Sequence, residues 1–81
     1  MDISKIRATV DFYKSKTVLL KLTSGQILAV GIHDTDEDNA ICIPKEILQD
    51  SFDGKRTLAE ILADPKSYIY IPLLDIVSIS E

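Results

Sequence analysis

Two alternating segments joined by a glycine turn constrain the fold of this chain most strongly. Residues 17–22 (TVLLKL) and 26–34 (QILAVGIHD) place apolar side chains at every second position. A period of two is typical of β-strands with one buried face. Ser24-Gly25 lies between them, and glycine adopts positive φ at little cost, which favours a tight turn. The sequence therefore predicts a β-hairpin, with Gly31 marking a bend, a bulge or a close backbone approach inside its second strand.

Three further short strands follow the same pattern. AICIP at 40–44 ends at a proline, and SYIYIP and DIVSIS occupy the tail at 67–72 and 75–80. We expect strands 1–3 within residues 17–44 and strands 4 and 5 within residues 67–80.

Helical signals occur before and between these strands. In residues 1–15, Ile3, Ile6 and Val10 have helical spacing and Ser4 is available as a cap, although the β-branched residues of this segment leave a strand possible. In residues 45–66, Thr57-x-x-Glu60 forms a capping-box pattern that predicts a helix from about residue 58 to 63.

These elements describe a single domain over residues 1–81. The expected fold class is mostly β: a small five-stranded barrel of the SH3 type, with an N-terminal helix and a short helical insertion between strands 3 and 4. The chain is 46% hydrophobic, more than an isolated domain of 81 residues usually needs. Some of this apolar surface is therefore expected to be buried against another copy of the chain.

Two blocks of the chain resemble the motifs of the Sm/LSm family. LTSGQILAVGIHDTDEDNAICI is similar to the first motif, an apolar strand, a glycine turn, a strand with an internal glycine, and then Asp and Asn. The tail IPLLDIVSI fits the apolar frame of the second motif, with Pro72-Leu73 where the family has Arg-Gly. The resemblance implies a Sm-like barrel and a ring of subunits. The positions that carry the first motif are Leu22, Gly25, Gly31, Asp36 and Asn39.

The last two strands independently predict self-association. Both are apolar on much of each face, and an exposed apolar strand edge pairs readily with another chain unless charges or prolines oppose it. Only Pro72 and Asp75 do so here. In the family that the chain resembles, these strands join neighbouring subunits into a closed ring, so we expect a homo-oligomer. The expected interface residues are Tyr68, Ile69, Tyr70, Ile71, Ile76, Val77 and Ile79.

The segment HDTDEDNAI at 33–41 carries four acidic residues, and no base occurs from residue 23 to 44. The resemblance implies that Asp36 and Asn39 contact an RNA base in the centre of a ring. The position that would stack on the base holds Glu37 or Asp38, which have no aromatic face.

The N-terminal segment is the other candidate surface for RNA. Residues 1–21 carry five basic residues against two acidic ones, whereas the rest of the chain has four bases against eleven acids. A polyanion is attracted only to the basic part. We expect Lys5, Arg7 and Lys14 to provide the contacts if RNA binds there.

Three other interpretations of the acidic segment remain open. Asp34, Asp36 and Asp38 have the spacing of the first ligands of a calcium loop, but Lys45 occupies the place of the bidentate glutamate, so calcium binding would be weak. The loop would alternatively bind a basic protein partner, as part of an interaction module without nucleic-acid activity. It would otherwise be a solvated turn, for which Asp and Asn are well suited.

Other functional classes have little support in the sequence. His33 has no nucleophile beside it, and Cys42 is the only cysteine, which excludes an internal disulfide. We expect no enzymatic activity, no small-molecule substrate and no cofactor other than weakly bound calcium. Residues 1–11 lack the apolar core of a signal peptide and no apolar run has the length of a membrane span, so a cytoplasmic location is expected.

Overall fold

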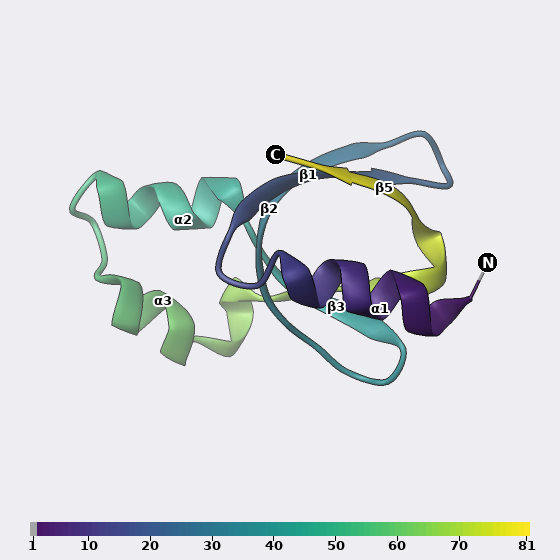
Figure 1. Cartoon of the computed structure of the whole chain (residues 1–81). Helices are drawn as coiled ribbons and strands as arrows, with labels where there is room; N and C mark the ends of the chain where they lie inside the picture. The colour runs from purple at the N-terminus through teal and green to yellow at the C-terminus, as the bar shows by residue number, and fades with distance from the viewer. Residues whose placement is uncertain (1) are drawn as a thin grey trace.

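A five-stranded antiparallel sheet, an N-terminal helix and a helical insertion make up this small α/β domain (Figure 1). The structure is a computed structural model, and it describes residues 2–81. The elements in chain order are α1 (Ile3–Phe12), β1 (Thr17–Leu22), β2 (Ile27–Thr35), β3 (Asn39–Pro44), α2 (Lys45–Phe52), α3 (Leu58–Ala63), β4 (Ile69–Pro72) and β5 (Ile76–Ser80), with short 3₁₀ turns η1 (Pro65–Ser67) and η2 (Leu73–Asp75).

The strands lie in the order β4-β3-β2-β1-β5, and every neighbouring pair is antiparallel. The predicted hairpin is confirmed: β1 and β2 pair from Thr17↔Gly31 to Lys21↔Ile27, and Gly25 in the turn has φ +88°. The five antiparallel strands and the N-terminal helix are also as expected. The sheet is not closed into a barrel, however, because β4 and β5 lie at its two opposite edges and do not pair with each other.

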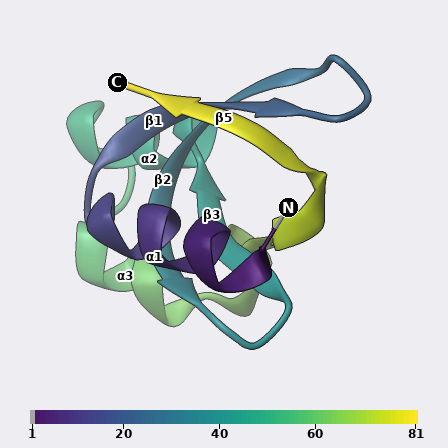
Figure 2. The ribbon, with the colours of Figure 1, turned by 45° about the vertical axis from the view of Figure 1, so that its right-hand side comes forward.

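The sheet curves strongly, and α1 lies across its concave side (Figure 2). The inward side chains of the strands meet Ile6 and Val10 of α1 in one apolar core. The helix is shorter than the predicted 1–15. Its N-terminus is capped by Asp2, whose carboxylate accepts a hydrogen bond from the Ser4 amide at 2.9 Å, so the predicted cap at Ser4 was wrong. Burial of the helical face settles the helix–strand ambiguity of this segment in favour of the helix.

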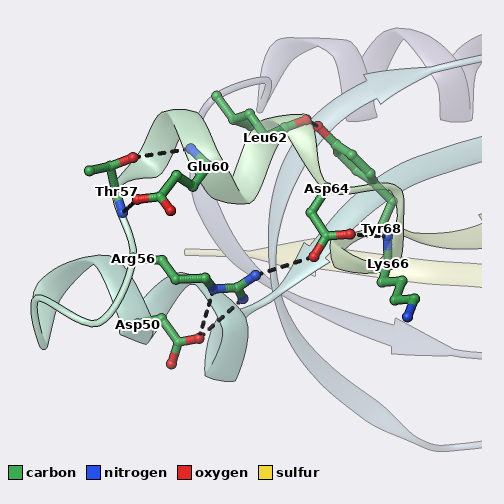
Figure 3. Close-up of polar contacts among 8 residues, drawn as sticks. All are labelled: Asp50, Arg56, Thr57, Glu60, Leu62, Asp64, Lys66 and Tyr68. Atoms are coloured by element: carbon green, nitrogen blue, oxygen red, sulfur yellow. Dashed lines mark hydrogen bonds and ion pairs between the residues drawn. The ribbon is translucent and has the colours of Figure 1, made fainter.

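The insertion between β3 and β4 contains the predicted capping box. The Glu60 amide donates to Thr57 Oγ1 at 3.1 Å, the Thr57 amide donates to Glu60 Oε1 at 3.0 Å, and α3 spans the predicted residues (Figure 3). Arg56 bridges Asp50 of α2 at 3.1 Å and Asp64 after α3 at 3.4 Å. These contacts hold the two short helices together. Among residues 2–81, no helix has the length and apolar character needed to cross a membrane.

A close contact between Gly31 and Leu48 seats α2 on the convex face of the sheet. A Cβ atom at Gly31 would lie 2.7 Å from Leu48 Cδ1, which is closer than real Cβ contacts. Ile43, the partner of Gly31 in β3, faces the same side and is only 3% exposed. Glycine in this strand is therefore needed for a close approach, one of the three roles that the sequence allowed. The bulge lies next to it, between Ile32 and Asp34.

We predict that Gly31→Ala lowers the free energy of unfolding by about 1 kcal/mol, because the added methyl group displaces Leu48. In a Leu48→Ala background the same change should be neutral or stabilising, since alanine loses less entropy on folding than glycine. Urea unfolding of the unchanged protein, the two single variants and the double variant measures both effects. Equal costs in the two backgrounds would contradict the assigned contact.

Candidate functional site

The acidic loop between β2 and β3 is an ordered turn built around Asp36. The Asp36 carboxylate accepts hydrogen bonds from the Asp38 amide at 2.9 Å, the Asn39 amide at 2.7 Å and Asn39 Nδ2 at 3.4 Å. The two backbone donors are the main reason why the pKa of Asp36 is lowered from its ordinary value. Asp36 and Asn39, the two predicted RNA contacts, are thus brought together, and they bind each other.

Helix α1 holds the base of the same hairpin through a polar cluster. Lys14 Nζ lies 2.9 Å from Asp34 Oδ1 and 3.6 Å from Asp11 Oδ1, and Thr35 Oγ1 donates to Asp11 at 2.7 Å. The hydrogen bond between Lys14 and Asp34 is the largest cause of a raised pKa at Lys14 and of a lowered pKa at Asp34. Lys14, one of the basic residues predicted to contact RNA, is therefore paired with the acidic segment.

Arg7 reaches the tip of the loop. Its Nε donates to the Asp36 carbonyl at 3.3 Å, and its guanidinium also donates to the Glu37 carbonyl. On another side, the Leu73 amide donates to the Asp38 carbonyl at 2.8 Å. Arg7 of α1 thus places a guanidinium beside the backbone of the loop.

The predicted calcium ligands point to different partners. Asp34 pairs with Lys14, and the Asp36 carboxylate accepts hydrogen bonds from within its own turn. The Asp38 side chain makes no hydrogen bond or ion pair in the described part of the chain. Among residues 2–81, no three His, Cys, Asp or Glu side chains gather into a set that could hold a metal ion. The geometry gives the calcium hypothesis no support.

The free edges of the sheet form the second candidate surface. Within residues 2–81, β4 pairs only with β3 and β5 only with β1, so each leaves one side of its backbone without a partner strand. Among the predicted interface side chains, Tyr70 is 60% and Val77 49% exposed. Ile71 and Ile76 are buried in the core of the chain itself, and Ile69 and Ile79 are half-buried against it.

Tyr68 lies just before β4 and contacts the insertion. Its hydroxyl donates to the Leu62 carbonyl at 2.5 Å (Figure 3). Its ring lies 5.0 Å from the His33 ring. Tyr68 therefore fastens α3 to the sheet. The same contact gives His33 a packing partner.

Two hollows lie on the surface, and the sequence pointed to neither. One, of about 270 Å³, runs between α1 and the free edge strand β5, with Ile6, Thr9 and Val77 in its lining. The other, of about 570 Å³, separates the insertion from the convex face of the sheet. Gly31 lines the second hollow, and a close approach at this residue was one of the three roles that the sequence left open.

Cys42 is fully buried in the core, and burial raises the pKa of its thiol to about 12. Because the thiolate is the reactive form, this residue packs and does not react.

No protein-family model, curated protein or solved structure matches the chain. The loop, the edges and the hollows are therefore the features from which a function can be inferred.

We predict that Asp36→Ala lowers the urea midpoint near neutral pH, because two backbone donors of the hairpin tip lose their acceptor. The pKa of Asp36 is lower in the folded state than its ordinary value of 3.8. The charged carboxylate therefore stabilises the fold at pH values above 3.8, and this contribution is lost as the pH falls through the folded pKa. The difference from the unchanged protein should thus shrink in acid. Asp38→Ala is the matched control and should leave the midpoint unchanged at both pH values.

Proposed function

We propose that this chain assembles head to tail, β4 of one copy on β5 of the next, into a closed homo-oligomeric ring that acts as a Sm-like binding or scaffolding unit. The observation that carries the proposal is the position of β4 and β5 at opposite edges of one unclosed sheet. The two edges differ, so the contact between them joins unlike surfaces. Contacts of this kind leave a free edge on each added copy and end only when a ring closes.

The edges are poorly protected against pairing. An unpaired strand presents a row of N–H and C=O groups that another strand can satisfy, and charges, prolines and bulges are the usual obstacles. In β4 the obstacle is Pro72 at its end, and β5 has no charged side chain between Ile76 and Ser80. Tyr70 and Val77 add exposed apolar surface to the two edges.

The hollow between α1 and β5 supports the same assembly. It runs along the free edge of β5, and Ile76 and Ile79 contribute apolar surface to it. In β4, Ile69 and Ile71 pair with Cys42 and Ala40, whose side chains are fully buried, so they face the concave side of the sheet. A β4 strand added to β5 would continue that apolar face beside α1. The ring organisation implied by the Sm/LSm resemblance uses the same two strands.

Complementary edge variants test the proposal. Tyr70→Lys blocks β4 and Val77→Lys blocks β5, and both side chains are exposed, so each variant should stay folded. We predict that the unchanged protein sediments as a ring at micromolar concentration and that each variant alone is a monomer. Mixed together, the two variants should form a dimer and nothing larger, because they retain one compatible pair of edges. Phe12→Lys, at an exposed site on α1, is the matched control.

A monomeric unchanged protein would contradict the ring. A mixture of the two variants that remains monomeric while the unchanged protein is oligomeric would instead show that another surface joins the subunits.

RNA binding at the loop is the second candidate function. The observation that favours it is the convergence of Asp36, Asn39 and the Arg7 guanidinium at one hairpin tip. Glu37 and Asp38 oppose it, since a ring would multiply carboxylates near a phosphate backbone. An interaction module that presents this acidic tip to a basic partner, without nucleic-acid activity, remains the alternative.

We predict that any affinity for single-stranded RNA is present only at low salt, because salt screens the attraction between the few basic side chains and the phosphates. Asn39→Ala should reduce this affinity, because the Asn39 carboxamide would bind the edge of a base. Fluorescence anisotropy with labelled oligouridylate measures both effects, and Gln49→Ala, on α2, serves as the control. Absence of binding at low salt would remove the RNA role and leave the ring proposal untouched.

A further inference from the structure

The cleft between the insertion and the sheet has the size of a small-molecule site. Its volume is about 570 Å³, and such sites commonly enclose roughly 300–1,000 Å³. None of the residues that line it belongs to β4 or β5, so the cleft is present whether or not a ring forms. The apolar part of its lining comes from both the sheet and the helices: Gly31, Ile43, Leu48, Phe52, Leu58 and Leu62.

Large apolar side chains at the cleft remain in contact with water. Phe52 is 82% and Leu58 51% exposed, although α2, which carries Phe52, packs on the sheet through Leu48. Covering this surface is favourable in proportion to the apolar area removed from water. An apolar ligand body in the cleft would do so.

The lining also has a polar part that carries one positive charge. Ser15 and Lys16 of the turn before β1 belong to it, as does Thr17 at the start of β1, and backbone hydrogen bonds of 2.8 and 3.0 Å tie Ser15 and Lys16 to Ile32. His33 and Ser51 are its other polar members. Among the described residues that line the cleft, Lys16 carries the one full charge and none is a carboxylate, although the whole chain has a net charge of −4. The charge therefore favours a ligand with a single negative group.

Lys16 can meet such a group by a change of side-chain conformation. Its Nζ lies 3.5 Å from Glu81 Oε1, in an ion pair that is about half exposed on both sides, and 5.1 Å from the centroid of the Phe12 ring. Neither Glu81 nor Phe12 lines the cleft, so the ammonium group turns away from them to reach a ligand there. Exposed ion pairs contribute little to stability, so an incoming anion can replace Glu81.

We propose that this cleft binds a medium-chain fatty acid, with the alkyl chain along the apolar lining and the carboxylate at Lys16. The single cation matches a singly charged carboxylate better than a doubly charged phosphate monoester. Ser15 and Thr17 provide hydroxyl donors beside it.

Titration of the ¹⁵N-labelled protein with octanoate, below its micelle concentration, tests the proposal, and 1-octanol of the same chain length is the uncharged comparison. Shifts should centre on the cleft, and octanoate should bind about fivefold more tightly than octanol, as expected for one partly screened charge pair. Lys16→Gln should abolish this preference. Glu81→Gln should strengthen octanoate binding, because it removes the competing carboxylate. Lys21→Gln, an exposed lysine outside the cleft lining, should change nothing.

A second variant tests the apolar part of the cleft. Leu58→Asn, which adds polarity without charge, should weaken octanoate and octanol alike, and the side chain is exposed enough for the fold to persist, which circular dichroism checks. The proposal is overturned by any of three results: no saturable shifts at the cleft, equal affinity for acid and alcohol, or octanoate binding that Lys16→Gln leaves unchanged.

Discussion

Backbone hydrogen bonding sets the condition on which the rest of this structure depends. Each interior strand of the sheet satisfies both sides of its backbone, and the two edge strands satisfy one side each within the described chain. The connection between them, η2, is three residues long, and it carries the chain from one edge to the other without pairing β4 to β5. An unclosed sheet with two unlike edges has a direction, and the proposed head-to-tail assembly depends on this direction. The same sheet is strongly curved, and α1 packs on its concave face.

The acidic loop shows how local charge is used in a small fold. Four carboxylates within a short segment repel one another, yet two of them have specific tasks. Asp36 supplies the acceptor that closes the hairpin tip, and Asp34 binds Lys14 and thereby holds α1 to β2. Arg7 adds two bonds to backbone carbonyls of the tip. Loop and helix thus form one polar surface next to the apolar core. The side chains that remain free there, Glu37 and Asp38, give it a negative character.

The insertion is held to the sheet by a small number of specific contacts. Leu48 approaches the bare backbone at Gly31, and Tyr68 reaches back to the Leu62 carbonyl. Between these contacts the helices stand away from the convex face and leave the cleft whose charged member is Lys16. The arrangement separates the two proposed functions in space. The strand edges are available for other copies of the chain, and the cleft is available for a ligand that none of the edge strands touches.

Local chemistry determined much of this protein from the sequence by itself. The alternation in residues 17–34 specified the hairpin, and Thr57 and Glu60 specified where α3 begins, because each signal acts over a few neighbouring residues. Gly31 indicated a bend, a bulge or a close approach without deciding among them. Only the tertiary structure decided which element approaches Gly31, that Lys14 and Asp34 neutralise each other, and that the sheet stays open. Those outcomes depend on contacts between segments far apart in the chain. Periodicity shows which face of a helix or strand is buried, but it does not show which distant group packs against that face.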